Sequence, residues 1–541
     1  MKKSIIALSA IAALSTSAFA AELTNSQMMQ QIEALKAQLS ALEKQVGQTA
    51  TTTKENKVSL ENMMKGDPSS ISDARFKKLE KKVDGIGKKA NLAKAQSAGD
   101  NLKWNVDFRT QVDNIQYKHA SGKKSKNNAL MTNRLNLGMK YAADENSIFY
   151  GTLSYMKAFG DTANHSQSNT RPGYADFDWL TNENATGNDL KVKEAYWLYR
   201  NDSFLGNKDV AWTASVGRRP STDGLGINLR ANQKRKSPLS HTVNVEFDGA
   251  SARFNLDKIT GVEGMWFKFC AGRGLTNAKQ RFQFDGTDYA KDETLHSDID
   301  MAGFIFVPYD DGQYSVHMNY ARAWNLIGFT NNQLGAYQGA MMTAATASDM
   351  MNAQSLLQFN DVGDMDLATI MFKVDGIGDE ISDYLDNTTV FASYAMSRTR
   401  PNASNAFGTT LGMLGSIDKE TGNSVWLGVN APCPIDPENS RIGIEWNKGS
   451  KYWRSMTYGE DTMTGSKIAA RGTAWEIYRT QQLTKALSFG INATYVKYDY
   501  TGSNSFFGAE GTPMTIDQAK LMGQDPVESA RDIKAYVRYS F

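Results

Sequence analysis

The last nine residues of the chain, IKAYVRYSF (533–541), alternate between apolar and polar side chains. Isoleucine, alanine, valine, tyrosine and phenylalanine fall on one face of an extended chain, and lysine, tyrosine, arginine and serine fall on the other. Such alternation predicts a β-strand that has one apolar and one wet face. Chain ends usually fray unless something holds them, so the aromatic last residue, Phe541, indicates that this terminus is held.

The first residues of the chain have the pattern of a secretory signal peptide. Lys2 and Lys3 precede an apolar run (5–14), and the small residues of Ala-Phe-Ala (18–20) provide a cleavage site. The apolar run is too short for a membrane-spanning helix, which needs about 20 residues. We therefore expect residues 1–20 to be removed and the mature chain to leave the cytoplasm.

Composition narrows the classes of protein further. After the signal peptide, no segment has 18 consecutive apolar residues, which argues against a membrane-spanning helix. The chain has 60 basic and 58 acidic residues, so its charge indicates no nucleic-acid partner. Its two cysteines, Cys270 and Cys433, are too few for a disulfide scaffold, and the sequence leaves open whether they pair.

Residues 21–99 follow a helical rather than an extended period. Their apolar residues recur at alternating intervals of four and three, which is the spacing of a coiled-coil seam. One helix alone does not bury so narrow a seam, so we expect it to bind a second copy of the chain. A solvated and partly helical spacer is the alternative, because the seam is short. The predicted seam residues are Met28, Ile32, Leu35, Leu39, Leu42 and Val46.

From residue 100 to residue 541 the apolar period is two. Alternating segments repeat about sixteen times, without the apolar surplus of a two-sheet core, and short connections between them alternate with long ones. We therefore expect an all-β transmembrane barrel of about 16 antiparallel strands over 100–541. The expected strands are 102–116, 131–142, 148–158, 190–200, 209–217, 241–255, 263–272, 298–307, 313–323, 364–374, 388–399, 440–447, 451–458, 470–481, 487–500 and 530–541.

The polar faces of these strands carry charged side chains, which predicts a wet interior. A barrel of about 16 strands is wide enough to leave an aqueous channel. Aromatic residues near the strand ends fit the girdles that barrels place at membrane interfaces. The residues that we expect to face the lumen are Arg109, Arg134, Lys140, His317 and Arg538.

Four internal stretches and the terminal strand carry a family resemblance. The stretches are VGRRPSTDGLG (216–226), FDGASARFNL (247–256), EIYRTQQLT (476–484) and YDYTGSNSFFG (498–508). The chain resembles Gram-negative outer-membrane porins. More narrowly, it is similar to an uncharacterised family of porin-like proteins that have a signal peptide, an N-terminal coiled coil and a C-terminal β-barrel.

The resemblance implies a channel in the outer membrane for passive diffusion of small hydrophilic solutes. It implies a homo-oligomer, a trimer among porins, that is surrounded by outer-membrane lipid and lipopolysaccharide and has residues 21–99 in the periplasm. It also implies that Tyr539 and Phe541 belong to a signal read by the outer-membrane assembly machinery. The alternative function is a structural or adhesive surface protein, anchored by the barrel and bound to a partner through the coiled coil.

The connection between Gly217 and His241 is rich in basic residues and has one acidic residue, Asp223. General porins fold their third outer loop into the lumen, so the resemblance assigns the constriction to this loop. A basic constriction favours anions over cations. The alternative is that these charges point outward and bind lipid phosphates. The constriction candidates are Arg218, Arg219, Arg230, Lys234, Arg235 and Lys236.

Nothing in the sequence predicts an enzyme. The five histidines are isolated from one another, and no HExxH, GxSxG, CxxC or Walker motif is present. We therefore expect no catalytic residue, no metal site and no cofactor. The long connection 324–363 is rich in alanine and methionine, which favours a short helix within the loop.

Overall fold

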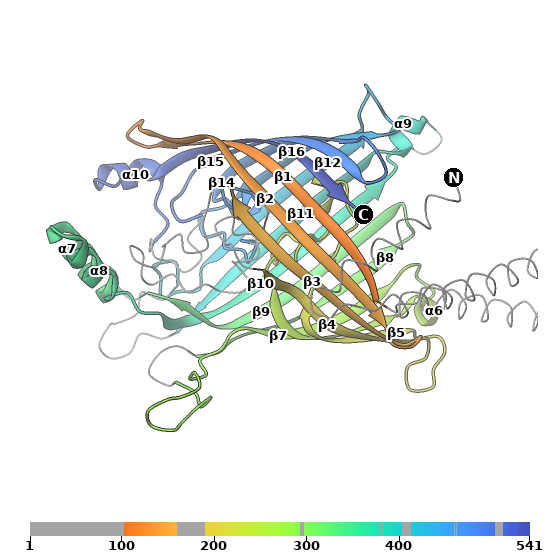
Figure 1. Cartoon of the computed structure of the whole chain (residues 1–541), viewed down its shortest axis with the longest axis horizontal. Coiled ribbons are helices and arrows are strands. Elements are labelled where there is room, and N and C mark those ends of the chain that lie inside the picture. The colour runs from red at the N-terminus through yellow and green to blue at the C-terminus, as the bar shows by residue number, and fades with distance from the viewer. Residues whose placement is uncertain are drawn as a thin grey trace, which may run out of the picture. The chain divides into compact units, whose positions relative to one another are not determined.

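A computed structural model shows the predicted barrel as a closed sheet (Figure 1). The described residues are 102–159, 190–292, 297–329, 331–378, 381–402, 413–458, 460, 462–503 and 512–541. They belong to the second of the two units into which the chain divides, Ala98–Phe541. The expected signal peptide (1–20) and the expected coiled-coil seam (28–46) lie outside the described residues.

Sixteen strands form the barrel, each bonded to its neighbours in chain order, and β1 closes the sheet against β16. Every pair is antiparallel, which confirms the predicted fold class. The strands are β1 (Leu102–His119), β2 (Lys124–Ala142), β3 (Ser147–Ala158), β4 (Lys191–Asn201), β5 (Trp212–Arg219), β6 (Phe247–Asn255), β7 (Trp266–Leu275), β8 (Ile299–Asp310), β9 (Tyr314–Gly328), β10 (Asn360–Asp375), β11 (Thr389–Pro401), β12 (Thr421–Pro432), β13 (Ser440–Gly449), β14 (Gly472–Gln482), β15 (Leu487–Tyr498) and β16 (Val527–Ser540).

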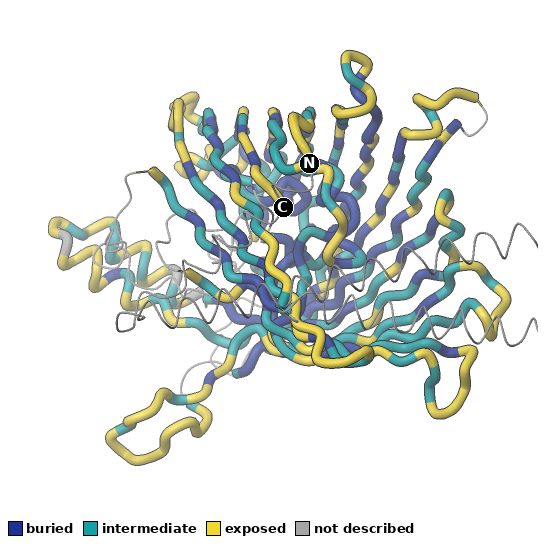
Figure 2. Tube along the Cα trace, turned by 45° about the vertical axis from the view of Figure 1, so that its right-hand side comes forward, coloured by how far each residue is buried: buried dark blue, intermediate teal, exposed yellow. Residues whose placement is uncertain are grey.

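The terminal strand β16 behaves as its alternation predicts. Lys534 and Arg538 are buried on the inner face of the wall, whereas Val537 is exposed on the outer face. Buried and exposed positions alternate in this way along most strands (Figure 2). Phe541 exchanges two backbone hydrogen bonds of 2.9 Å with Val106 of β1. The last residue of the chain is therefore part of the seam that closes the barrel.

The connections at the two ends of the barrel differ in length. At one end the strands are joined by short connections such as 143–146, 311–313 and 483–486, and at the other by long ones such as 220–246 and 329–359. We call these the short-turn end and the long-loop end. The turn 120–123 is short although it lies at the long-loop end, because β1 and β2 continue further than we expected.

The structure corrects two strand assignments, whose errors cancel in the count of strands. β12 lies where we expected a loop, and the expected strand 451–458 is a loop. In β12, Gly422 and Gly428 interrupt the pattern, and the large apolar Trp426 is fully buried on the inner face. Residues 453–457 are all buried, without alternation, because this segment is enclosed inside the barrel.

Two short helices occupy the connection between β9 and β10, α7 (Asn331–Thr343) and α8 (Ala347–Gln354) (Figure 1). Thr346 caps α8, because its side chain accepts a hydrogen bond from the backbone N–H of Asp349 and the Asp349 carboxylate accepts one in return. The short helix that we predicted from the alanine and methionine content of the connection 324–363 is thus confirmed. No helix in the described part of the chain is both long and apolar enough to cross a membrane.

Candidate constriction inside the barrel

The connection between β5 and β6 folds into the barrel, and we call it the crossing loop (220–246). It leaves the wall at β5 and returns at β6, and it contains one short helix, α5 (Ile227–Arg230). Between these points it contacts β11, β12, β14 and β16, which lie across the closed sheet from β5 and β6. The crossing loop therefore spans the lumen from one wall to the other.

Apolar contacts anchor the first half of the crossing loop. Leu225 and Ile227 are buried in a cluster with Phe391 and Trp426 of the opposite wall. Gly226 lies between them with φ of 98°, in the left-handed region that favours glycine. A Cβ atom at Gly226 would lie 2.1 Å from the indole ring of Trp426. Any side chain at this position would therefore push the loop away from the wall.

His241 holds the returning half of the crossing loop. Its Nδ1 atom lies 2.8 Å from Ser393 Oγ and its Nε2 atom 2.9 Å from Ser424 Oγ. Its ring makes T-shaped contacts with Trp426 and Trp453 at centroid distances of 5.5 and 5.8 Å. Burial lowers the pKa of His241 to about 3, so the ring is neutral at physiological pH. A neutral ring donates one of these hydrogen bonds and accepts the other.

The connection between β13 and β14 also folds inside, and we call it the bracing loop (450–471). The backbone N–H of Met456 donates to the carbonyl of Thr242 at 2.8 Å, and the N–H of Asn244 donates to the carbonyl of Met456 at 2.7 Å. Within the bracing loop, the indole N–H of Trp453 donates to the carbonyl of Ile468 at 2.9 Å. The two loops therefore form one hydrogen-bonded layer inside the barrel.

Five buried charged residues join this layer to the wall, and we call them the ion cluster: Arg230, Glu445, Glu460, Lys467 and Glu476. Lys467 Nζ lies 2.7 Å from Glu445 Oε2 and 3.6 Å from Glu460 Oε1, and it also contacts Glu476. Arg230 Nη1 lies 3.1 Å from Glu460 Oε1 and 3.5 Å from Glu476 Oε2. Burial alone would lower the pKa of Lys467, but the three carboxylates raise it above its usual range.

Neutral donors add further hydrogen bonds to the ion cluster. Trp426 Nε1 donates to Glu445 Oε2 at 3.0 Å, and Asn492 Nδ2 donates to Glu476 Oε1 at 3.1 Å. Buried charges are tolerated only when they are paired and hydrogen-bonded, and removing one partner is strongly destabilising. The ion cluster therefore fixes the two loops on β13 and β14, and its cations and carboxylates pair with one another.

The tip of the crossing loop faces a cavity instead of a packed wall. The cavity has a volume of about 280 Å³ and lies between Ala231–Lys234 and the strands β14–β16. Its lining includes three cations, Lys234, Lys485 and Arg538, and no carboxylate. Because Lys485 belongs to the connection 483–486, the cavity lies toward the short-turn end of the barrel.

Arg538 ties the tip of the crossing loop to the seam between β1 and β16. Its Nε and Nη2 atoms lie 2.7 and 2.8 Å from the carboxylate of Asp107. Nη2 also donates to Gln233 Oε1 at 2.9 Å, and Nη1 donates to the Ala231 carbonyl at 3.3 Å. Asp107 also pairs with Arg134, so it offsets only part of the charge of Arg538, and the two lysines add further positive charge to the cavity.

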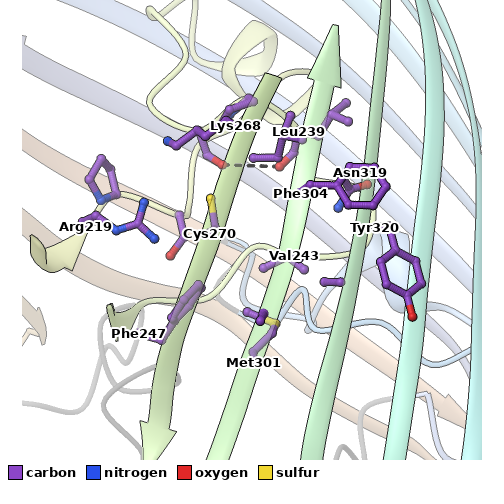
Figure 3. Close-up of a pocket in the computed structure, with 18 residues that line it drawn as sticks. Arg219, Leu239, Val243, Phe247, Lys268, Cys270, Met301, Phe304, Asn319 and Tyr320 are labelled. Carbon is purple, nitrogen blue, oxygen red and sulfur yellow. Dashed lines mark hydrogen bonds between the residues drawn. The ribbon is translucent and has the colours of Figure 1, made fainter. Parts of the chain in front are cut away.

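A smaller cavity of about 70 Å³ lies between the crossing loop and the strands β7–β9 (Figure 3). Arg219, Lys268 and Cys270 line it together with the apolar side chains of Leu239 and Val243. Such a volume has room for a few water molecules at most. The crossing loop is therefore closely packed on this wall, and the larger cavity is the better candidate for a solute path.

Sequence comparison places the chain in a family. Residues 124–541, more than half of the chain, match the family described as protein of unknown function (DUF3373). The chain belongs to the DUF3373 family. No curated protein matches it.

Several solved structures resemble this DUF3373 chain. They include OmpF of Salmonella typhi in complex with daunomycin, with 10% identity and a TM-score of 0.42 over 82% of this chain and 99% of that one. An anion-selective porin from Comamonas acidovorans has 12% identity and a TM-score of 0.41 over 81% and 99%. OprB of Pseudomonas putida has 12% identity and a TM-score of 0.41 over 81% and 94%. Likeness at this level carries no functional argument, so function has to be argued from this chain's own geometry.

The basic residues predicted at the constriction do not act as one group in the DUF3373 chain. Lys234 lines the larger cavity, and Arg235, the next residue, is exposed. Lys236 is also exposed, and its Nζ lies 3.6 Å from Glu194 Oε1 on β4. Arg230 belongs to the ion cluster and is 5% exposed. The loop thus offers some of its cations to the lumen and buries another.

Arg218 and Arg219 are not in the crossing loop, because β5 continues two residues further than we expected. Arg219 faces inward and lines the smaller cavity. Arg218 shares the outward face of β5 with Val216, and its Nη1 lies 3.7 Å from Asp248 Oδ1 on β6. Arg218 is 9% exposed, and it belongs to the end of β5 rather than to the crossing loop.

The five residues expected to face the lumen all occupy inward positions of the wall. Arg109 lies 5.8 Å from the ring centroid of Tyr536, and Lys140 lies 5.7 Å from that of Tyr150. Arg134 Nη2 lies 3.3 Å from the carboxylate of Asp107, and His317 Nε2 lies 3.0 Å from Ser315 Oγ. The contacts of Arg538 are described above. His317 is fully buried, so it is not offered to a solute.

Sequence reasoning missed the residues of the bracing loop and of the short turn. Lys467 and Glu460 lie in the segment that we expected to connect the strands 451–458 and 470–481, and Lys485 lies in a short turn for which we predicted no function. One signal was present: Lys467 stands within Ser-Lys-Ile-Ala-Ala (466–470), where small and apolar neighbours indicate enclosure. Arg230, which belongs to the same ion cluster, is 230 residues from Glu460 in sequence and gave no local signal.

His119 is a histidine of the described residues that lies near both a serine and an aspartate. His119 Nε2 lies 3.0 Å from Ser125 Oγ, but its Nδ1 is 3.9 Å from Asp525 Oδ2, beyond hydrogen-bonding distance. No group of three or more His, Cys, Asp or Glu residues suited to a metal occurs in this part of the chain. Cys270 and Cys433 are both free, and Cys433 lies at the short-turn end, in the connection between β12 and β13.

Proposed function

We propose that this chain is an outer-membrane porin that lets small hydrophilic solutes diffuse passively and prefers anions. Three properties of the barrel support the proposal. Its wall is closed, so no strand edge is left unpaired, as a bilayer requires. Its outer face is apolar and its inner face is charged. Two long loops fold inside and narrow the lumen, as a selective channel needs.

The observation that carries the anion preference is the 280 Å³ cavity beside the tip of the crossing loop. Lys234 and Lys485 line it, and neither has an ion pair within the described part of the chain. Arg235 adds an exposed cation next to Lys234. An uncompensated positive charge at a narrow point lowers the energy of an anion there and raises that of a cation.

Planar-bilayer recording tests this function. Purified, refolded protein is expected to produce discrete current steps, and a gradient of KCl across the bilayer is expected to give a reversal potential of the sign for chloride preference. Protein that gives no current steps contradicts the channel and leaves the surface-anchor alternative. A reversal potential of the opposite sign contradicts the anion preference alone.

The assembly of the protein is part of the same proposal. Residues 21–99 would hold copies of the chain together through the seam from Met28 to Val46, and a porin trimer is the expected product. Deleting 22–99 and measuring the mass of the assembly tests this, and an unchanged mass contradicts it. Tyr539 and Phe541 would serve as the address for the assembly machinery. Deleting Phe541 is then expected to reduce the amount of folded barrel in the outer membrane.

A further inference from the structure

A row of cations and hydroxyl groups runs along the outer face of six adjacent strands toward the long-loop end. Consecutive members are register partners across β13, β14, β15, β16, β1 and β2. We call it the lysine–hydroxyl row, and its members are Lys448, Thr473, Lys497, Ser529, Lys118 and Lys124.

The positions below this row become less polar in two steps. On β13, β14 and β15 the next outward residues are Trp446, Trp475 and Tyr495, and the two indole rings lie 6.3 Å apart. One step further, Ile444 and Ile477 form an exposed apolar pair. Barrels place apolar residues at the hydrocarbon layer and aromatic residues at the interface. The lysine–hydroxyl row therefore reaches the level of the lipid headgroups.

On β16 the aromatic position is occupied by Arg531, which is register partner of Tyr495. Lys497 follows Tyr495 on the same face, so the guanidinium and the ammonium group lie on neighbouring strands. Side chains at such positions are separated by roughly 5–8 Å at Cβ. Arg531 and Lys497 have no ion pair within the described ranges of the chain. Arg531 Nη2 donates to Gln116 Oε1 at 3.4 Å, which leaves its charge uncompensated, so both cations can still attract an external anion.

On the opposite arc of the barrel, the outward cations lie next to carboxylates. Register partners on β5, β6, β7 and β8 read Arg218, Asp248, Arg273 and Asp300, so each cation has a carboxylate beside it. Arg273 Nε lies 2.7 Å from Asp300 Oδ1. The carboxylates of this arc therefore neutralise its cations. In the lysine–hydroxyl row the places between the cations hold Thr473 or Ser529 instead.

Two members of the lysine–hydroxyl row do have carboxylate partners. Lys448 Nζ lies 2.7 Å from Asp499 Oδ2, and Lys118 Nζ lies 2.8 Å from Glu528 Oε2. All four side chains are about a third to a half exposed. Pairs of this kind contribute little, so a multivalent anion displaces them readily. Lys448 Nζ also lies 3.2 Å from Thr473 Oγ1, which brings cation and hydroxyl to one point.

We propose that this arc binds the phosphate groups of an anionic glycolipid in the outer leaflet of the membrane. Lys448, Lys497 and Arg531 supply charge, and the hydroxyls of Thr473 and Ser529 supply further donors to phosphate oxygens. The acyl chains of the lipid lie along the apolar and aromatic positions below. The inference rests on the proposed outer-membrane location, but not on the channel or on its selectivity.

The test compares two variants of equal charge. In the first, Lys448→Gln, Lys497→Gln and Arg531→Gln remove the proposed site. In the control, Lys208→Gln, Lys258→Gln and Lys419→Gln remove three exposed lysines outside the row. Native mass spectrometry of detergent-purified protein measures bound diphosphorylated lipid A. Each interfacial cation contributes about fivefold to affinity for an anionic lipid surface, so the first variant is expected to bind about 100-fold more weakly.

The outcomes separate this inference from the proposed function. Wild-type affinity in the first variant, or an equal loss in the control, overturns the site. Monophosphorylated lipid A is expected to bind more weakly than the diphosphorylated form, and equal binding overturns the role of phosphate. Conductance of the first variant is expected to match that of the wild type. If lipid binding behaves as expected but no preparation conducts, the proposed channel fails and the lipid site stands.

Discussion

Two cations of the crossing loop, Arg230 and Lys234, lie four residues apart and have opposite situations. Arg230 is buried within 3.5 Å of two carboxylates, and Lys234 is exposed at a cavity that no carboxylate lines. Both belong to one basic stretch of sequence, and we predicted the same role for both, as residues of the constriction. The difference teaches that the role of a charge in this lumen is decided by the elements folded against it. We call Arg230 and the other contacts of the crossing loop inside the barrel its buried end, and Lys234 at the cavity its exposed end. The buried end should control the stability of the barrel, and the exposed end should control the selectivity of the channel.

The largest effect is expected from Lys467→Met at the buried end. Lys467 contacts three carboxylates of the ion cluster, and methionine has a similar length without the charge. Breaking a buried ion pair by removing one partner costs about 3–5 kcal/mol. We expect a loss of that size in the free energy of unfolding, measured by urea unfolding of the refolded barrel. A loss below about 1 kcal/mol would contradict the bracing role.

A smaller loss is expected from Arg230→Met, because Lys467 still compensates Glu460 and Glu476. Hydrogen bonds to charged groups contribute about 1.5–3 kcal/mol, which is the expected decrease in stability. The crossing loop also loses one of its links to the bracing loop, the contact of Arg230 with Glu460, so single-channel conductance should rise and its noise should increase. Ala231→Gly, at the end of α5, is a matched control that leaves the charge in place. Unchanged conductance in Arg230→Met would show that the other contacts of the crossing loop hold it without Arg230.

His241 gives the buried end a pH dependence. Its pKa is about 3 when folded and near 6.5 when unfolded, so between these values only the unfolded chain takes up the proton. Stability therefore falls as pH decreases through this window, by about 1.4 kcal/mol per pH unit. His241→Gln keeps an amide for Ser393 or Ser424 and does not titrate. From pH 6.5 to pH 5 the wild type should lose about 2 kcal/mol more than the variant, and parallel curves would refute this assignment.

The sequence predicted those features that depend on local pattern. Alternation in β16 and β1 defines a strand and its two faces without knowledge of any neighbour. β12 was missed because Gly422 and Gly428 weaken the pattern and Trp426 reverses it. The ion cluster was beyond local reasoning, since Arg230 and Glu460 are 230 residues apart in sequence. These charges meet only because the crossing loop and the bracing loop both fold into the lumen. The periodicity of the sequence gives no sign of such folding.

The smallest effect in free energy is expected at the exposed end, from Lys234→Gln combined with Lys485→Gln. Neither lysine has an ion pair in the described ranges, so stability should change by less than about 0.5 kcal/mol. Selectivity should change more, because both charges line the 280 Å³ cavity. The reversal potential in a KCl gradient is expected to move toward zero, corresponding to a roughly two- to fivefold lower permeability ratio of anion to cation.

Salt separates a local effect of these lysines from a general effect of net charge. The control, Lys208→Gln with Lys258→Gln, removes the same charge at the short-turn end but outside the cavity lining. At 0.1 M salt charges act over about 10 Å, and at 1 M over about 3 Å. A solute inside the cavity passes close to Lys234 and Lys485, so their effect should persist at 1 M while that of the control disappears. Equal shifts in both variants would mean that the cavity is not the path, and the proposed division of the crossing loop would fail at its exposed end.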